Sequence, residues 1–294
     1  MGDRVLAIDI GGTKLACGLV DDRGDIAARA TRPTGEGTDG EALFATLTGL
    51  IDEVMTGAEP TDTLVACGVG CGGPMTGGGA KVSPLNIEAW RDFPLLERVR
   101  AHTGMATTVD GDAKALALAE GWLGAAAGAR DYLAMVVSTG VGGGIVLDGR
   151  LLDGADGNAG HIGHVIVEPE GAVCGCGARG CLEAEASGTA IARATGRPAA
   201  EADLGVRRRT GRLVGRATAS VANLLDLPLV VVAGSVALGY GDDFFTAAQT
   251  EIDERCRLEY SRDTVIRPGG LGADGPLIGA AAVGWNAALG QLPS

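Results

Sequence analysis

Residues 4–24 read RVLAIDIGGTKLACGLVDDRG, and this stretch decides the fold class. Apolar runs on both sides of Gly11 and Gly12 predict two strands, and residues 21–24 have the composition of a hairpin turn. In a dinucleotide-binding Rossmann unit the glycine turn opens a helix, and a P-loop carries the pattern GxxxxGK[ST]. A strand follows the turn here, so the sequence argues against NAD enzymes and P-loop NTPases.

The residues of this turn suit phosphate binding. Gly11 and Gly12 let backbone N–H groups approach phosphate oxygens, Thr13 adds a hydroxyl and Lys14 adds a cation. Asp9 is itself acidic, but it can hold Mg²⁺ through water as a hard oxygen ligand. The sequence therefore predicts a β-hairpin phosphate loop with an adjacent magnesium site.

The pattern returns later in the chain. Residues 6–24, LAIDIGGTKLACGLVDDRG, are similar to residues 133–150, LAMVVSTGVGGGIVLDGR. We predict a strand over 132–138, a glycine-rich turn over 139–144 and a strand over 145–147. The spacing far exceeds the ~20–50 residues of a solenoid repeat, so it indicates duplicated domains facing one cleft; two unrelated hairpins are the alternative.

The second turn supplies further candidate nucleotide contacts, and a third candidate lies at the end of the apolar run 230–233. There Gly234 stands before a predicted helix, whose N–H groups suit nucleotide binding, although a plain strand-to-helix junction has the same pattern. The candidates in the second turn are Thr139, Gly140, Val141, Gly142 and Gly143.

A histidine and three cysteines have the spacing of a metal site. His164 precedes Cys174, Cys176 and Cys181, which match a Cys₃His zinc set with no position left for water. We therefore expect one structural zinc. The remaining cysteines are scattered and fit core packing.

Residues 109–115, VDGDAKA, place acidic side chains where a strand ends and a helix starts. Asp112 is a candidate general base for a hydroxyl group, and the plainer alternative is a helix-capping role. His161 and Glu183 flank the zinc ligands and offer hydrogen bonds to hydroxyl groups; Glu183 also fits a local cap or pair.

Composition narrows the class of protein. The chain has 294 residues, which suits two domains, and a net charge of −13, which disfavours a nucleic-acid surface. The run Arg207 to Arg209 fits a solvated helix face beside acidic neighbours. With no export signal before residue 5 and no apolar run of ~18 residues, we expect a cytoplasmic protein without membrane contact.

Together these motifs resemble the ROK (repressor, ORF, kinase) family of sugar kinases over nearly the whole chain. The resemblance is carried by DIGGTK at 9–14, STGVGGG at 138–144, AGHIGH at 159–164 with CGCGARGCLEA at 174–184, and VVAGSV at 231–236. It implies an α/β, duplicated actin/hexokinase-like (ribonuclease H-like) fold with two lobes around a cleft.

The resemblance also implies domains, ligands and residue roles. A small lobe covers 1–111 and is joined by a C-terminal helix at about 277–294, and a large lobe covers 112–276 with the zinc loop. ATP with Mg²⁺ is the expected cosubstrate, a homodimer the expected assembly, and Asp112 the catalytic base. The residues implied at the sugar are Gly73, Asn86, Asp112, His161, His164 and Glu183.

Two departures from the family pattern concern the substrate. Gly111 replaces the asparagine that usually precedes the catalytic aspartate, and His161 replaces the glutamate usual in the family's glucokinases. His161 favours an N-acylmannosamine kinase acting on the 6-OH, ahead of glucokinase and then of another hexose, amino-sugar or cyclitol kinase. Polyphosphate remains an alternative donor, and Gly111 keeps open a non-catalytic sugar sensor.

Overall fold

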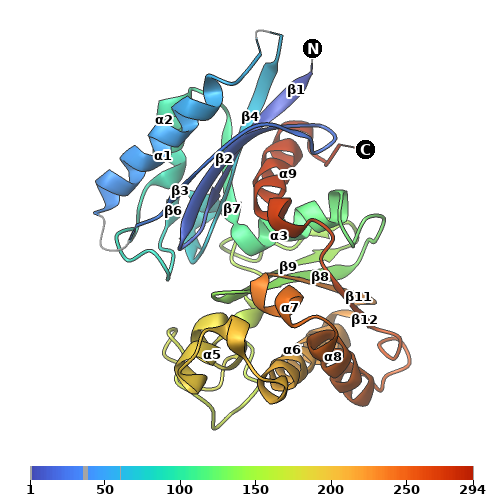
Figure 1. Ribbon diagram of the computed structural model, residues 1–294. Coiled ribbons are helices and arrows are strands. Elements are labelled where there is room, and N and C mark those ends of the chain that lie inside the picture. Colours follow the sequence, from blue (N-terminus) through green and yellow to red (C-terminus); the bar gives the residue numbers. More distant parts are fainter. Residues whose placement is uncertain (1, 36–38, 60, 294) are drawn as a thin grey trace. The chain divides into compact units, whose positions relative to one another are not determined.

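The computed structural model describes residues 2–35, 39–59 and 61–293, which form two compact units (Figure 1). Each unit is built from more than one stretch of chain. Unit 1 contains Met1–Leu123, Asp153–Ala159 and Ala273–Ser294, and unit 2 contains Gly124–Leu152 and Gly160–Gly272.

Unit 1 is organised around a five-stranded sheet of order β3-β2-β1-β4-β7. The first three strands form an antiparallel meander, and β4 and β7 extend it in parallel with β1. The turns predicted at Gly11–Gly12 and at residues 21–24 therefore join strands as expected. The strands are β1 (Asp3–Ile10), β2 (Lys14–Asp21), β3 (Ile26–Pro33), β4 (Thr63–Cys71) and β7 (Thr107–Gly111).

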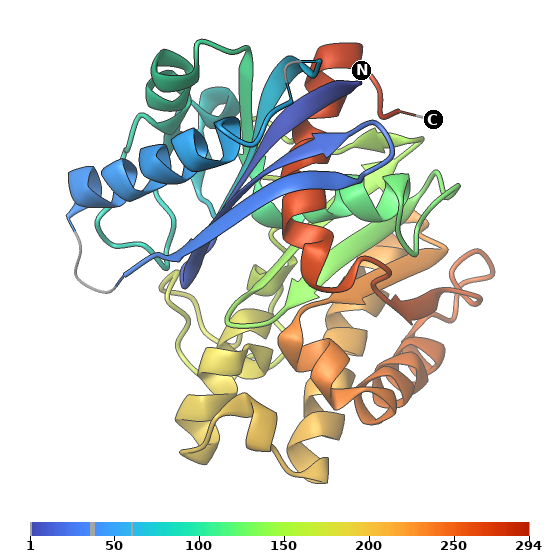
Figure 2. The same cartoon turned by 45° about the horizontal axis from the view of Figure 1, so that its top comes forward.

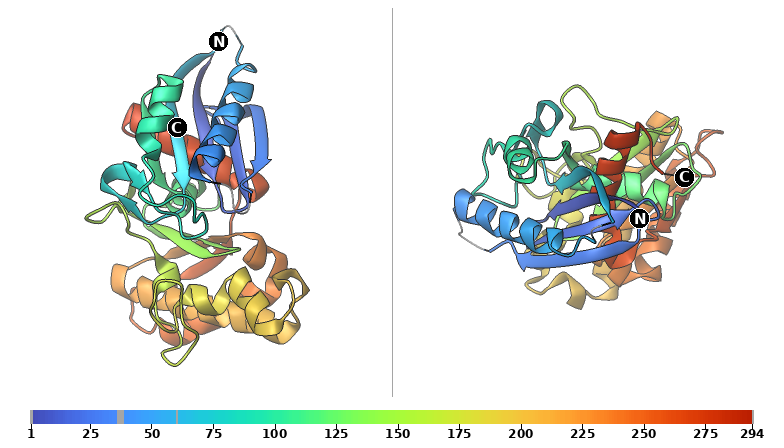
Figure 3. Two further views of the ribbon diagram at one scale, coloured as in Figure 1. Left: turned by 90° about the vertical axis from the view of Figure 1, so that its left-hand side faces the viewer. Right: turned by 90° about the horizontal axis from the view of Figure 1, so that it is seen from above.

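Side chains along β1 alternate between the two faces of the sheet, so the core of unit 1 has two layers. Leu6 and Ile8 pack with α1 (Gly40–Met55) and α2 (Leu95–Thr103) on one face of the sheet. Val5 and Ala7 point to the other face, where α9 (Gly275–Leu289) covers them and α3 (Asp112–Trp122) packs against α9. Figures 2 and 3 show α1 and α9 on opposite faces of this sheet.

Helix α1 has one apolar side and a capped first turn. Its apolar residues, including Leu43 and Leu47, recur at helical spacing and are buried in this core. The Asp39 carboxylate accepts hydrogen bonds from the N–H groups of Glu41 and Ala42 and so caps the first turn. Between β4 and α2 lie a small hairpin and a short 3₁₀ turn: β5 (Met75–Thr76), η1 (Gly77–Gly79) and β6 (Lys81–Val82).

Unit 2 repeats the sheet of unit 1 with the same strand order, β10-β9-β8-β11-β12. Its first three strands are again antiparallel and its last two parallel to β8. This shared topology supports the predicted duplication over two unrelated hairpins. The strands are β8 (Tyr132–Val137), β9 (Val141–Leu147), β10 (Arg150–Leu151), β11 (Leu229–Ala233) and β12 (Val265–Pro268).

The helices of unit 2 pack their apolar sides into one core, in which α6 and α8 lie side by side (Figure 1). Asp203 caps α6 by accepting a hydrogen bond from Val206 N–H at 2.9 Å. The helices and 3₁₀ turns are η2 (Ile162–His164), α4 (Leu182–Ala186), α5 (Gly188–Thr195), η3 (Ala199–Glu201), α6 (Leu204–Leu225), α7 (Ser235–Tyr240) and α8 (Asp242–Arg255), and η4 (Gly272–Asp274) leads back to unit 1.

The predicted glycine-rich turn over 139–144 is shorter than expected, because β9 already begins at Val141. Three of its glycines pair with β8 as strand residues. A Cβ on Gly143 would lie 3.0 Å from Ile162 and 3.2 Å from the carbonyl oxygen of Gly160. A larger residue at this position would therefore be crowded by residues 160–162 and by the Ala134 carbonyl oxygen, at 3.1 Å, although the backbone does not turn there.

The compact units differ from the predicted domain boundaries in two places. The prediction put residue 112 at the start of the large lobe, but α3 groups with unit 1, where it packs against α9 and β4. Residues 153–159, predicted within the large lobe, also belong to unit 1. In the described residues 2–35, 39–59 and 61–293, no helix is both long and apolar enough to span a bilayer.

Candidate functional site

Asp9 stands at the end of β1, on the same face as Val5 and Ala7 and therefore towards α9. Only 8% of its surface is exposed. Burial and, to a smaller extent, the negative charge of Asp112 raise the pKa of this carboxyl group to about 7, and the positive charge of Lys14 opposes the shift. A buried carboxylate beside a second acid favours a bound cation, so Asp9 fits the predicted Mg²⁺ role by its chemistry.

A cavity of about 30 Å³ reaches this carboxylate from the α9 side of the sheet. Its wall is polar on the β2 and β3 side and apolar at the start of α9. The lining residues are Asp9, Lys14, Ala16, Arg29, Thr31, Ala273, Pro276 and Leu277.

The predicted phosphate turn keeps a defined shape in unit 1. Gly11 N–H donates to the carbonyl oxygen of Lys14 at 3.0 Å, and the Thr34 hydroxyl donates to the carbonyl oxygen of Gly11 at 2.7 Å. Thr13 and Lys14 are exposed at its tip, which leaves the hydroxyl and the ammonium group accessible to an anion.

Asn86, Asp112 and Asp9 converge on the end of β4. A Cβ placed on Gly72 would lie 3.6 Å from Asn86 Oδ1 and 3.9 Å from Asp112 Oδ2, and one on Gly70 would lie 3.9 Å from Asp9 Oδ1. The Asn86 amide also borders the phosphate turn, since a Cβ on Gly12 would lie 2.5 Å from its Nδ2.

Asp112 is the first residue of α3 and is exposed, so its side chain is accessible at this junction. Gly73 lies on the neighbouring loop, where its carbonyl oxygen accepts a hydrogen bond from Leu85 N–H at 3.3 Å. Unit 1 thus brings Asn86 close to both Asp112 and the first glycine turn.

The second glycine turn is framed by the starts of two helices in unit 2. Gly188 N–H donates to the carbonyl oxygen of Ser138 at 2.7 Å, and the Thr189 hydroxyl donates to that of Thr139 at 3.0 Å. Ser138 Oγ lies 2.9 Å from Ser235 Oγ at the start of α7, next to Gly234 with φ 99°. Gly234 therefore stands beside the second turn, where the nucleotide prediction places it.

Glu183 makes the local contact that its alternative role predicts. Its Oε2 accepts a hydrogen bond from Val141 N–H at 2.9 Å, which ties α4 to the second glycine turn. The rings of His161 and His164 lie 5.9 Å apart, and His161 is exposed. Both histidines and Glu183 are thus presented within unit 2 close to the metal cluster.

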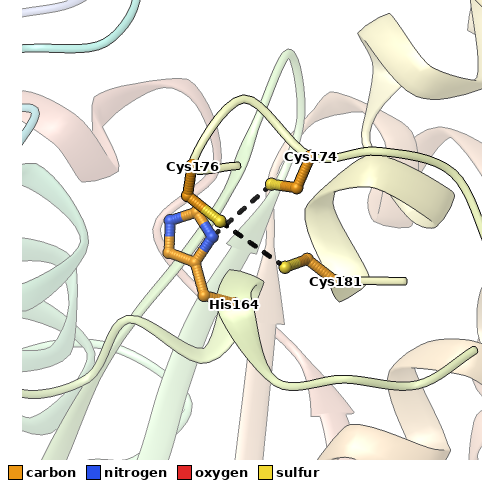
Figure 4. A group of neighbouring side chains, drawn as sticks. All are labelled: His164, Cys174, Cys176 and Cys181. Atoms are coloured by element: carbon orange, nitrogen blue, oxygen red, sulfur yellow. Dashed lines mark hydrogen bonds between the residues drawn. The ribbon is translucent and has the colours of Figure 1, made fainter. Parts of the chain in front are cut away.

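His164, Cys174, Cys176 and Cys181 come together, with their ligand atoms all within 4.8 Å of one another (Figure 4). His164 Nδ1 lies 3.7 Å from Cys174 Sγ, and Cys176 Sγ lies 3.7 Å from Cys181 Sγ. A tetrahedral zinc with Zn–S bonds of about 2.3 Å sets its sulfurs about 3.8 Å apart. The donor set and its spacing therefore fit one zinc.

The zinc loop is braced by arginines of α6. Arg209 Nη2 donates to Glu185 Oε2 at 2.6 Å, and Glu185 Oε1 accepts from Ala172 N–H at 2.6 Å. Arg216 donates to the carbonyl oxygen of Val167 at 2.9 Å. In the arginine run at 207–209, Arg208 and Arg209 are exposed beside acidic residues, as predicted, whereas Arg207 is half-buried over the Tyr240 ring.

The comparisons with known proteins identify the family. The model of the ROK family matches residues 5–286. The chain belongs to the ROK family. An N-acetylmannosamine kinase of Citrobacter koseri is 39% identical over 251 residues, or 80% of this chain and 84% of the relative.

Solved ROK structures extend the likeness over nearly the whole chain. A ROK hexokinase from Thermus thermophilus is 32% identical, with a TM-score of 0.79 over 97% of this chain and 98% of that one. A ROK glucokinase from Streptomyces griseus, solved with glucose and AMPPNP, is 29% identical, with a TM-score of 0.80 over 96% and 99%. The ROK fold is that of the actin-like sugar kinases, as the sequence predicts.

Proposed function

We propose that this chain is an ATP-dependent kinase that phosphorylates the 6-OH of an N-acylmannosamine. One observation carries the proposal: Asp112, Asn86 and Asp9 converge on the Gly70–Gly72 end of β4. A general base, an amide and a buried carboxylate suited to a cation are what phosphoryl transfer to a sugar hydroxyl requires. The named N-acetylmannosamine kinase relative and His161 favour that sugar.

The chemistry follows from these roles. Asp112 accepts the proton of the sugar hydroxyl while the oxygen forms a bond to the γ-phosphorus of ATP, and the bond from that phosphorus to the β-phosphate oxygen breaks to release ADP. Asn86, Gly73 and Glu183 orient the sugar together with the two histidines. The two glycine turns and Gly234 bind the nucleotide, and Asp9 holds Mg²⁺, which neutralises phosphate charge.

The zinc site has a structural part in this proposal. A zinc held by His164, Cys174, Cys176 and Cys181 would have no open coordination position for a substrate, and it would fix the loop that presents His161 and Glu183. From the family resemblance we also propose that the protein forms a homodimer and acts in the cytoplasm.

The test is ADP release in a coupled assay with glucose, mannose, N-acetylglucosamine and N-acetylmannosamine. We expect the highest kcat/KM with N-acetylmannosamine. Highest activity with glucose would assign the glucokinase alternative, and repeating the panel with polyphosphate in place of ATP decides the donor.

Gly111 favours a second candidate, a non-catalytic sugar sensor. The atoms nearest to a Cβ at this position would be those of the Lys114 side chain, at 3.7 Å, so there is room for the first carbon of the asparagine usual in the family, and glycine leaves the site without that amide. Sugar binding without ADP release from any sugar of the panel would support the sensor and refute the kinase.

A further inference from the structure

The chain leaves unit 2 after Leu152 and re-enters it at Gly160. The segment between, Asp153–Ala159, groups with unit 1 and is called the excursion below. The chain before them ends the β10 strand, and the chain after them leads through Gly160 to His161. Within unit 1 this excursion is held by side chains that the sequence analysis did not single out.

Lys114 makes the first attachment. Its side chain is 5% exposed, and its ammonium group lies 2.8 Å from Asp110 Oδ1 and 2.8 Å from Asp153 Oδ1. It also donates to the carbonyl oxygen of Gly157 at 3.3 Å. A buried ammonium group is costly without such partners, so the two carboxylates and the carbonyl fix it in place. Because Lys114 follows Asp112 by two residues on α3, the excursion is attached to the helix that carries the candidate base.

Asn158 makes the second attachment with both ends of its amide. Met75 N–H donates to Asn158 Oδ1 at 3.1 Å, and Asn158 Nδ2 donates to the Met75 carbonyl oxygen at 3.0 Å. Met75 opens β5, two residues after Gly73 on the loop that continues from the end of β4. These two hydrogen bonds between the Asn158 amide and the Met75 backbone resemble those of a residue pair in a β-sheet. They fix the direction of the chain as well as its position.

The covalent chain between Asn158 and His161 also limits where His161 can lie. Three residues span at most about 11 Å, so His161 cannot move further than that from the anchored Asn158. The attachment also restricts the directions from which the chain can enter the loop of His161 and His164.

We propose that Lys114 and Asn158 are positioning residues that hold Asp153–Ala159 on unit 1 and thereby place His161 against the sugar. The proposal rests on the kinase function proposed above. A displacement of about 1 Å at a group that orients the substrate weakens catalysis strongly. Because His161 is assigned to the sugar, loss of either positioning residue should weaken the use of the sugar and leave nucleotide binding unchanged.

The test uses the full-length protein with Asn158→Ala, and with Asp156→Ala as the matched control, since Asp156 lies on the same excursion with an exposed side chain. Hydrogen exchange followed by mass spectrometry should show faster exchange over residues 153–161 in Asn158→Ala and an unchanged pattern in the control. Loss of two hydrogen bonds should raise the KM for N-acetylmannosamine about tenfold and leave the KM for ATP unchanged. Lys114→Met should act in the same direction on both readouts.

The outcomes separate this proposal from the kinase proposal. Unchanged exchange over 153–161 in both variants overturns the anchoring, whatever the enzyme's activity. Faster exchange with an unchanged sugar KM, or an equal rise in both KM values, overturns the positioning of His161. If the wild-type protein phosphorylates no sugar of the panel, the kinase proposal fails, and the exchange measurement still decides the anchoring.

Discussion

Replacing Asp9 by asparagine should stabilise unit 1 in magnesium-free buffer, and the gain should depend on pH. Burial and the charge of Asp112 raise the pKa of Asp9 to about 7 from its ordinary 3.8. Between these values the unfolded chain releases the proton while the folded chain keeps it. The stability contributed by neutral Asp9 is therefore full below about pH 4 and is lost as the pH rises through 7.

The size of the effect follows from the same shift. About three pKa units correspond to about 4 kcal/mol, so the free energy of unfolding of Asp9→Asn should exceed that of the wild type by up to about 4 kcal/mol at pH 8. The difference should shrink towards zero at pH 4. Adding Mg²⁺ at pH 8 should stabilise the wild type and leave the variant unchanged.

Urea titration with tryptophan fluorescence is the appropriate assay. Trp90, Trp122 and Trp285, the three tryptophans of the chain, all belong to unit 1, so the signal reports the unit that contains Asp9. Asp22→Asn, at the exposed turn between β2 and β3, is the matched control and should give a difference that does not change with pH. A pH-independent difference for Asp9→Asn as well would refute the burial argument.

Two further predictions concern the proposed chemistry and the metal. Asp112→Asn should lower kcat by about 10²–10⁴-fold and leave the dissociation constant for the sugar, measured by calorimetry, nearly unchanged; unimpaired turnover would remove Asp112 from the mechanism. Cys176→Ser should reduce the zinc content from about one per chain to well below one and speed hydrogen exchange over residues 174–184, because a structural zinc contributes folding free energy. Purified wild-type protein that contains no zinc would contradict the metal assignment. The control is Cys256→Ser, which changes a buried cysteine outside the cluster.

The features predicted well from the sequence are those encoded by neighbouring residues. The hairpin after Gly12 follows from alternation and turn residues, and β2 begins at Lys14 as that pattern requires. The zinc ligands lie close together in sequence with glycines between them, so their spacing alone indicates a shared ion. The duplication was visible because each copy repeats the same local order of strand, turn and strand.

The features that the sequence did not reveal depend on contacts between distant residues. Asn158 and Met75 are 83 positions apart, and Lys114 and Asp153 are 39 positions apart, so no local periodicity links them. The glycines after Val141 suggest a turn because glycine favours turns, whereas in the structure they pair with β8, and residues 160–162 pack closely against Gly143. Likewise α3 joins unit 1 because of its packing against α9, which is encoded at the far end of the chain.

The covering of the first strand by α9 has a consequence for biosynthesis. Val5 and Ala7 leave the ribosome long before the helix that shields them, Gly275–Leu289, has been translated. Throughout elongation the nascent sheet of unit 1 must therefore keep an apolar face exposed, which is the condition under which chaperones bind and aggregation begins. Truncation within the final helix should accordingly reduce soluble yield far more than its small share of the chain would suggest.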